Sequence, residues 1–269
     1  MSGWRPCLLR GLVLAALMSP LANPDPAFAS SSASTTGGSR TCTASQVRES
    51  ATTDHFLYSP GETVRARASI VNTSAATCTI SVGGTSPTFT IFDSAGVARW
   101  SYCNSLVRPE TCPLYLRLVT LAPAQRFSTT HPWTPAAGPS GSTLFGVFRL
   151  TVSFSGFATT DTALVLGVPT TTTRVITPAD SGGKVKLRRG QRLVTRFPSS
   201  SFYRWSVPQS SNSGSLVRQS TASNGGATSI FLARNTGVAK VSAVGTPFCY
   251  PECLAPSRLF TIDVTVART

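Results

Sequence analysis

Residues 237–266 read GVAKVSAVGTPFCYPECLAPSRLFTIDVTV, and this stretch decides the fold. Every second residue from Phe260 to Val266 is apolar and the residues between them are mostly polar, which is the period of a half-buried strand. The preceding run, 238–244, is small and β-branched and ends before a Gly and a Pro. Two such runs predict a β-hairpin.

The loop that joins the two runs carries three prolines together with Cys249 and Cys253. Proline fixes φ and has no amide donor, so we expect the loop to be stiff. We also expect a disulfide between its two cysteines. A rigid loop displayed on a sheet favours binding, and nothing in this stretch points to a reaction centre.

Short alternating runs separated by turn residues fill the rest of the chain from Cys42 onward, without helical periodicity of convincing length. The runs lie at 64–70, 88–92, 97–102, 114–121, 144–154, 162–168, 174–177, 184–190, 193–197, 202–207 and 228–234. Ser181-Gly182-Gly183 predicts a hairpin turn, and the Pro-rich residues 130–142 predict a surface loop. This pattern is typical of all-β proteins built from antiparallel sandwiches.

We therefore predict two tandem immunoglobulin-like antiparallel β-sandwich domains, spanning 41–168 and 174–269. The linker is 169–173, which reads PTTTT and lies where the strand pattern restarts. Each part has the size of an ordinary domain.

The first 40 residues predict export. A basic segment precedes the apolar run 12–21, and Ala27-Phe28-Ala29 stands before Ser30, so 1–29 are interpreted as a cleaved signal peptide. The run is too short to span a bilayer, so no stable membrane insertion is expected; a retained anchor is the alternative. Residues 30–40 read as a disordered Ser/Thr/Gly lead-in. We expect a soluble protein, either secreted or held in the cell envelope.

Six cysteines remain after the signal peptide, and an even number in an exported chain predicts three disulfides. Proximity favours the pairs Cys42 with Cys78, Cys103 with Cys112, and Cys249 with Cys253. A zinc site is the alternative, but the two histidines lie far from the last pair and no C-x-x-C occurs. We expect no metal and no cofactor.

The chain has 24 Lys and Arg against 10 Asp and Glu, a formal charge of +14. Outside the cell such an excess suits anionic wall polymers, acidic lipids or acidic protein surfaces, and no nucleic-acid motif accompanies it. One group of cations is dense enough to form a ridge for an acidic polymer, or else a solvated face that protects a sheet edge. Its members are Lys184, Lys186, Arg188, Arg189, Arg192 and Arg196.

Enzyme activity is not expected. Hydrolysis usually needs a base beside a nucleophile, and the only histidines are His55 and His131. Neither G-x-S-x-G nor H-E-x-x-H occurs, and the cysteines are expected to be oxidised. Paired carboxylates are the alternative that spacing does not reveal.

Three aromatic residues are candidates for partner contacts. Tyr203 and Trp205 share one face of a strand, and we expect Trp205 in the core, with an interface anchor as the alternative. Trp133 lies in a proline-rich segment and is the better candidate for an exposed aromatic residue.

The second half, from about Val175 to Val266, resembles the chagasin-like family of cysteine-protease inhibitors, in a form common among exported bacterial proteins. The resemblance rests on Leu187, Arg189-Gly190 and Leu193, on Tyr203-Arg204-Trp205, on Ile230-Phe231 with Thr236 to Ala239, and on Leu259 to Val266. It implies an immunoglobulin-like fold and three loops that enter the cleft of a papain-like protease.

Carried over by position, those loops are 198–202, 224–227 and 247–260. The resemblance therefore implies partner-binding residues at Ser199, Ser200, Ser201, Phe202, Asn224, Gly225, Gly226, Phe248, Tyr250 and Arg258. Three serines stand where the family has Asn-Pro-Thr-Thr-Gly, and the third loop carries the cysteine pair in place of Arg-Pro-aromatic.

The first half, about 53–154, looks like the domain named for an intracellular bacterial proteinase inhibitor. The matching pieces are Pro60-Gly61, Val71-Asn72-Thr73, Phe92 to Val97 with Arg99-Trp100-Ser101, and Leu121 to Ala124 before Trp133. This resemblance again implies a β-sandwich.

Together these features predict a secreted binding protein without enzyme activity that engages a protein partner, with a papain-like protease as the candidate, through loops of its C-terminal sandwich. The alternative is an envelope or matrix protein that adheres to anionic polymer through its arginines.

Overall fold

The computed structural model describes residues 40–84, 86–103, 115–135, 144–198, 202–223, 226–248 and 255–268. Within these ranges the regular structure is β-strand with three single 3₁₀ turns, so the all-β prediction is confirmed. No helix in the described ranges is long and apolar enough to cross a membrane. The predicted signal peptide and nearly all of the lead-in lie outside the described residues.

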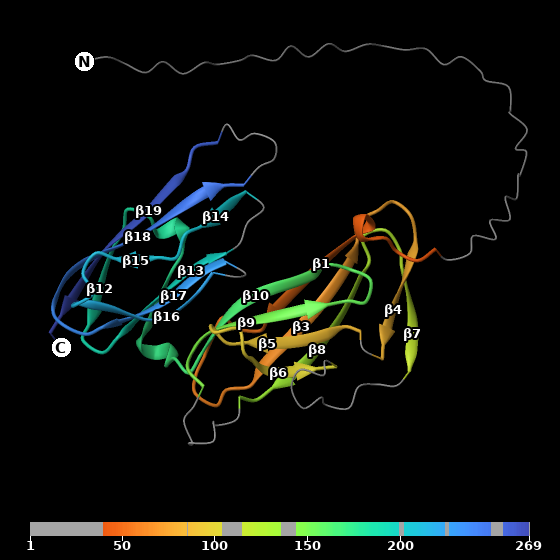
Figure 1. The fold of residues 1–269 in the computed structure, drawn as a ribbon, viewed down its shortest axis with the longest axis horizontal. Helices are drawn as coiled ribbons and strands as arrows, with labels where there is room; N and C mark the ends of the chain where they lie inside the picture. Colours follow the sequence, from red (N-terminus) through yellow and green to blue (C-terminus); the bar gives the residue numbers. More distant parts are fainter. Residues whose placement is uncertain are drawn as a thin grey trace, which may run out of the picture. The chain divides into compact units, whose positions relative to one another are not determined.

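The N-terminal half, residues 40–168, places its core between two sheets (Figure 1). One sheet has the order β1-β3-β8 and the other β2-β10-β9-β5-β6, while β4 pairs with β7 alone. The strands are β1 (Val47–Thr53), β2 (Leu57–Tyr58), β3 (Val64–Asn72), β4 (Cys78–Gly83), β5 (Thr88–Phe92), β6 (Ala98–Tyr102), β7 (Leu116–Leu121), β8 (Arg126–Trp133), β9 (Gly146–Ser153) and β10 (Thr159–Leu166).

The strand β3 shows why this half folds as it does. Its residues Val64, Ala66, Ala68 and Ile70 are fully buried, and the arginines that alternate with the first three are exposed. Burial of this apolar row against the second sheet is the main stabilising contribution that the sequence pattern could predict.

The prediction of a surface loop at 130–142 is wrong for its first part, because residues up to Trp133 continue β8 and pair with β3. Trp133 is only 8% exposed and stacks on Trp100 of β6, with ring centroids 6.1 Å apart. Pro132 is tolerated because β8 is an edge strand of its sheet, where a missing amide donor costs little.

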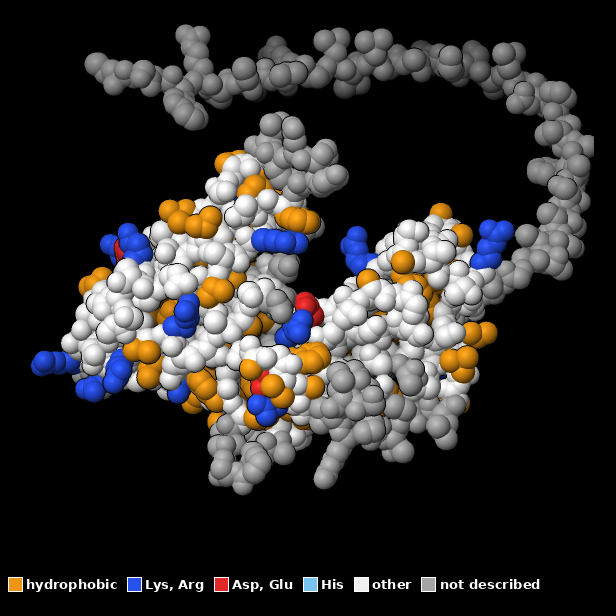
Figure 2. All heavy atoms as spheres, in the orientation of Figure 1, with side chains coloured by type: hydrophobic (Ala, Val, Ile, Leu, Met, Phe, Trp, Pro, Cys, Tyr) orange, Lys and Arg blue, Asp and Glu red, His pale blue; other side chains and the backbone are white. Residues whose placement is uncertain are grey.

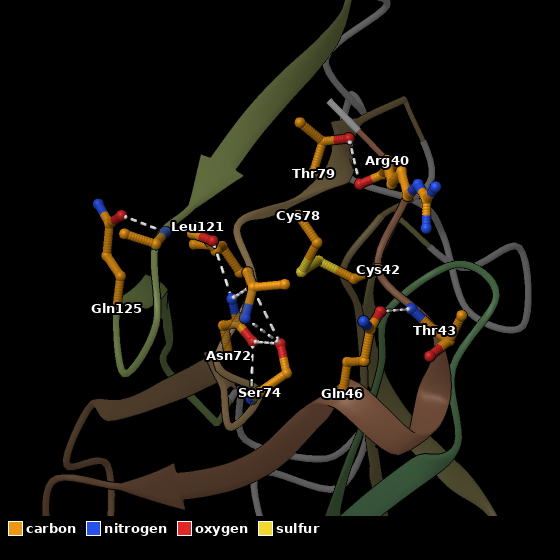
Figure 3. The surroundings of a disulfide bond; sticks show 12 residues. Arg40, Cys42, Thr43, Gln46, Asn72, Ser74, Cys78, Thr79, Leu121 and Gln125 are labelled. Carbon is orange, nitrogen blue, oxygen red and sulfur yellow. Dashed lines mark hydrogen bonds between the residues drawn. A yellow bond between two sulfur atoms is a disulfide. The ribbon is translucent and has the colours of Figure 1, made fainter. Parts of the chain in front are cut away.

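A disulfide joins Cys42 to Cys78, which confirms the first predicted pair (Figure 3). Cys103 is also disulfide-bonded, and its partner lies outside the described residues. The other three predicted cysteines, Cys112, Cys249 and Cys253, fall outside the described ranges as well.

Beside this disulfide, the buried side chain of Asn72 ties three segments together (Figure 3). Its amide nitrogen donates to the carbonyl oxygens of Ala76 at 2.7 Å and Leu121 at 2.9 Å. Its amide oxygen accepts from the backbone nitrogen and the hydroxyl of Ser74. One side chain thus provides hydrogen-bond partners for backbone groups in the turn after β3 and at the end of β7.

Glu49 gives the N-terminal half a pH-dependent stability. It lies opposite the buried Ile70 in the register of β1 and β3, so it shares the core-facing side, and burial raises its pKa to about 7. The contribution of Glu49 to the free energy of unfolding is therefore fully present below pH 4.5. It is lost as the pH rises through about 7, because the carboxyl group then becomes charged in the folded protein.

Replacing Glu49 with glutamine is therefore expected to raise the free energy of unfolding at pH 8 by about 1 to 2 kcal/mol, after a discount for solvent screening. At pH 4.5 the two proteins should be nearly equal. Urea unfolding at both pH values checks this, and an identical pH slope in the two proteins would contradict the assignment.

The C-terminal half, residues 173–268, also consists of two sheets with a core between them. Their orders are β11-β13-β17-β16 and β12-β19-β18-β14, with β15 on β18. The strands are β11 (Thr173–Ile176), β12 (Lys184–Arg188), β13 (Arg192–Pro198), β14 (Tyr203–Trp205), β15 (Gln209–Ser210), β16 (Leu216–Ala222), β17 (Gly226–Ala233), β18 (Gly237–Pro247) and β19 (Arg258–Ala267).

The hairpin predicted at 237–266 is confirmed, since β18 and β19 pair antiparallel from Gly237 opposite Val266 to Gly245 opposite Arg258. The hairpin predicted around Ser181-Gly182-Gly183 is wrong. The strands on either side of it belong to different sheets, and each pairs in parallel with another strand, β11 with β13 and β12 with β19. The sheets are therefore mixed, not purely antiparallel.

The outer face of β13 and β17 packs on the N-terminal half. Val194 and Ile230 join Val147, Val165 and Val168 in one buried cluster, and both halves belong to a single compact unit. Burial of these side chains removes apolar surface from water and so stabilises the contact between the halves. Contact between the halves was not predicted from the sequence.

Two arginines of β13 lie around this cluster. The guanidinium of Arg196 lies 4.4 Å from the ring centroid of Phe56, and that of Arg192 lies 5.3 Å from that of Phe145. The single ridge of six cations is therefore not formed. Lys184, Lys186 and Arg188 lie on β12 in one sheet, Arg192 and Arg196 lie on β13 in the other, and Arg189 lies in the turn between these strands.

Candidate functional site

Three connections leave the C-terminal half at the same end, which we call the loop end (Figure 1). They join β13 to β14, β16 to β17, and β18 to β19. The register brings them together, because Pro198 pairs with Gly226, Tyr203 with Pro247, and Gly245 with Arg258. Loops far apart in the sequence thus share one edge of the molecule.

Of the ten residues that the family resemblance assigns to partner binding, four are described, namely Phe202, Gly226, Phe248 and Arg258. All four lie at the loop end. The other six, Ser199, Ser200, Ser201, Asn224, Gly225 and Tyr250, lie outside the described residues.

Exposed aromatic rings and arginines alternate at the loop end. Phe202 is 54% exposed and Phe248 is 55% exposed. The guanidinium of Arg204 lies 4.0 Å from the ring centroid of Phe248, and that of Arg258 lies 4.8 Å from that of Tyr203. Cation–π contacts at these distances hold the rings and the charges in one arrangement.

Backbone contacts fix this arrangement. The amide of Phe248 donates to the carbonyl oxygen of Phe202 at 2.8 Å, which joins the first and third connections. The hydroxyl of Tyr203 donates to the carbonyl oxygen of Pro256 at 3.3 Å. The described parts of these two connections are therefore tied to each other as well as to their own strands.

Trp205 forms the floor of the loop end. It is half-buried and stacks on Phe197 of the core, with ring centroids 5.1 Å apart, which supports the predicted core role. Its ring also covers Gly245, where an added Cβ would lie 3.1 Å from three ring atoms. A hollow of about 270 Å³ lies beside the ring, bordered by Pro198, Tyr203, Arg204, Ser223 and Gly226.

The apolar surface continues onto the outer face of the second sheet. Val244 and Leu259 lie opposite each other in β18 and β19, and both are exposed. Figure 2 shows hydrophobic side chains beside Lys and Arg side chains on this part of the C-terminal half. Arginine and aromatic residues are the types that dominate protein interfaces, so this surface is suited to bind another protein.

Tyr203 was predicted only as a candidate aromatic contact, and Arg204 was not among the predicted site residues. The sequence does predict which way these two side chains face, because alternation around Trp205 places Arg204 on the solvent side and Tyr203 on the side of the core. Which aromatic ring each arginine contacts depends on pairing between strands, and no local pattern predicts it.

Both histidines are engaged in the N-terminal half. His131 stacks on Tyr102, with ring centroids 3.6 Å apart. His55 lies 4.0 Å from Asp54 and is held by Tyr58 through its backbone amide. Among the described residues no three His, Cys, Asp or Glu side chains converge on a potential metal position.

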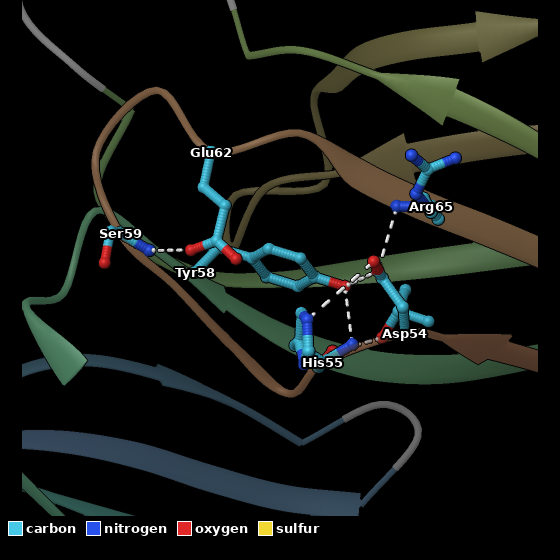
Figure 4. Close-up of polar contacts among 7 residues, drawn as sticks. Asp54, His55, Tyr58, Ser59, Glu62 and Arg65 are labelled. Atoms are coloured by element: carbon cyan, nitrogen blue, oxygen red, sulfur yellow. Dashed lines mark hydrogen bonds and ion pairs between the residues drawn. The ribbon is translucent and has the colours of Figure 1, made fainter.

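Tyr58 locks the segment that presents Phe56 to the C-terminal half (Figure 4). Its hydroxyl donates to the carboxylate of Asp54 at 2.6 Å and accepts from the amide of His55 at 2.9 Å. Partial burial pushes the pKa of Asp54 upward, but the hydrogen bonds from Tyr58 and from the amide of Arg65 outweigh it and lower the pKa overall. Burial raises the pKa of Tyr58.

Replacing Tyr58 with phenylalanine is expected to lower the free energy of unfolding by about 1 to 2 kcal/mol, because Asp54 and the amide of His55 lose a buried partner. Tyr203→Phe is the matched control, since its hydroxyl donates an exposed hydrogen bond to the carbonyl oxygen of Pro256. Urea unfolding of both variants checks this. Equal losses would show that the Tyr58 hydroxyl has no special role.

No protein-family model and no curated protein sequence matches this chain. Solved structures that are similar to parts of it include the cysteine protease inhibitor EhICP2 from Entamoeba histolytica, at 8% identity over 35% of this chain and 95% of that one, with a TM-score of 0.29. Amebosin matches at 18% identity over 35% of this chain and 96% of its own, with a TM-score of 0.23.

A β-glucosidase from Listeria innocua matches at 13% identity over 45% of this chain, with a TM-score of 0.28, and this chain spans only 16% of that enzyme. At TM-scores this low, none of the three likenesses decides the fold or the function.

Proposed function

We propose that this chain is a secreted binding protein without enzyme activity, which engages a protein partner through the loop end. The observation that carries the proposal is the pairing of aromatic rings with arginines where three connections converge: the exposed Phe248 with Arg204, and the half-buried Tyr203 with Arg258. Large aromatic rings that neighbours already hold in place can bury much area against a partner at little cost in entropy.

The partner that we propose is a papain-like cysteine protease. This follows the sequence resemblance of the C-terminal half to the chagasin-like family, which implies three loops acting together. The common edge of the three connections is compatible with that mode. The six candidate residues outside the described ranges, including Ser199 to Ser201 and Tyr250, remain part of the proposal.

The same proposal includes two immunoglobulin-like sandwiches joined at 169–173, and export after cleavage at residue 29. The Cys42–Cys78 disulfide supports an oxidising compartment, because such bonds are rare in the cytosol. Export places the chain where secreted proteases act.

Titration of several papain-like proteases with the chain from Ser30 onward tests this function. We expect inhibition at micromolar concentration, with no effect on a serine protease of similar size. The Arg204→Ala/Phe248→Ala double variant should lose the effect while its unfolding curve stays unchanged. No inhibition of any papain-like enzyme up to about 10 µM, which corresponds to less than about 7 kcal/mol of binding, would overturn the protease part.

A further inference from the structure

A row of cations lies on the edge strand β12, away from the loop end. Lys184, Lys186 and Arg188 are all exposed, and they alternate with Val185 and Leu187, which face the core. Because two residues of a strand advance by about 6.6 Å, the three charges form a straight row about 13 Å long. We call this row the β12 strip.

The strip is not neutralised by the acids near it. In the described part of the chain, none of its three side chains forms an ion pair with a carboxylate. Asp263 lies opposite Lys184 in the register, but its ion pair, at 4.0 Å, is with Lys240 of β18. Thr265 and Ala267 stand opposite the other two cations, so the excess charge faces solvent.

A groove of about 290 Å³ runs between β12 and the edge strand β11 of the other sheet. Lys184 and Lys186 border it on one side, and Arg174 with Thr171 to Thr173 border it on the other. Arg174 is exposed and, within the described residues, also lacks an ion pair. The groove adds a fourth cation and a polar wall to the straight row.

The strip is separate from the loop end. Lys184 to Arg188 pair with Asp263 to Ala267, which is the part of β19 farthest from Arg258. Figure 2 shows Lys and Arg side chains gathered on the part of the C-terminal half where the chain ends. A ligand held by the strip would therefore leave the loop end free.

We infer that the β12 strip and its groove bind a linear extracellular polymer with regularly spaced phosphate esters, of the poly(glycerol phosphate) type. Lysine binds phosphate as a point charge, and a flexible chain with one phosphate per glycerol unit can follow a straight row of cations. Each contact releases a counterion, so the affinity falls steeply with salt. Such binding would hold the exported protein at an envelope rich in this polymer.

Protection of a sheet edge is the competing explanation, since Lys and Arg commonly prevent edge strands from pairing. The two explanations differ in what they require. Edge protection needs charge of either sign, whereas polymer binding needs positive charge. A charge-reversed strip therefore separates them.

The test measures binding of fluorescent poly(glycerol phosphate) by anisotropy at low and at physiological salt. The variants are Lys184→Gln/Lys186→Gln/Arg188→Gln and the same three positions changed to Glu. The matched control is Arg48→Gln/Arg65→Gln/Arg67→Gln, which removes three exposed arginines from the outer face of β1 and β3. Sedimentation and urea unfolding report on self-association and folding of every variant.

Both strip variants are expected to bind at least about tenfold more weakly at low salt and to lose most of the salt dependence, while the control changes less than about twofold. Equal losses in strip and control would overturn the inference, because binding would then follow total charge alone. Retained binding in the Glu variant, or no binding by the wild type at low salt, would also overturn it.

Two further probes identify the ligand class. Single-stranded DNA and poly(glutamate) carry the same sign of charge as poly(glycerol phosphate). We expect both to bind more weakly than poly(glycerol phosphate). Tighter binding of either one would overturn the assignment to a glycerol phosphate polymer.

Discussion

Replacing Asn72 with alanine is expected to lower the free energy of unfolding by about 3 to 4 kcal/mol. The side chain is fully buried, and alanine would remove its hydrogen bonds to the carbonyl oxygens of Ala76 and Leu121 and to the amide of Ser74. The bond to Leu121 is buried, and losing such a bond costs about 1 to 3 kcal/mol; the part-buried bonds to Ala76 and Ser74 add a smaller cost. Urea unfolding near pH 6 measures the change.

Asn235→Ala is the matched control for this prediction. Asn235 is exposed and makes one side-chain hydrogen bond, to the carbonyl oxygen of Gly214 at 2.9 Å. Its loss should cost less than about 1 kcal/mol. If the two alanine variants were equally stable, the hydrogen bonds of Asn72 would not hold the end of β7 as described.

Phe248→Ala is expected to weaken binding to the protein partner by about 30-fold, which corresponds to about 2 kcal/mol. The variant removes the exposed aromatic ring at the start of the connection from β18 to β19. Arg204 then loses the ring over which its guanidinium lies. Stability should change little because the ring is 55% exposed. Surface plasmon resonance with an immobilised papain-like protease measures the dissociation constant.

Val97→Ala is the control, because Val97 is a large apolar residue of similar exposure, 49%, in a turn of the N-terminal half. It should bind as the wild type does. If both variants lost affinity equally, or if neither lost affinity, the loop end would not be the surface that binds the partner.

Strands with a clean apolar alternation could be predicted from the sequence. The row in β3 and the hairpin of β18 and β19 lie within two or three residues of the expected ranges, because a period of two is encoded locally. The Cys42–Cys78 pair followed from proximity in the sequence and is confirmed.

Elements whose burial depends on distant partners could not be predicted. The strand β8 contains Pro132 and a run of threonines, so its pattern is that of a loop, and it becomes a strand because β3 offers a free edge. The parallel pairs β11 with β13 and β12 with β19 were mistaken for a hairpin for the same reason. A local turn signal at Gly182 does not reveal which sheet the next strand joins.

The candidate site was predicted in part. The end of the sandwich that carries Phe202, Phe248 and Arg258 was expected from a family resemblance, and the structure groups these three residues. The arginine-to-ring pairs were missed because they join β14 to β18 and β19 across the sheet.

Hydrogen exchange of the full chain, alone and with saturating papain-like protease, tests the central claim most directly. The account predicts slower amide exchange in residues 202–205, 245–248 and 258–260, with β12 and the N-terminal half unchanged. Protection confined to β12 or to the N-terminal half, or no change anywhere with the protease in excess, would contradict partner binding at the loop end.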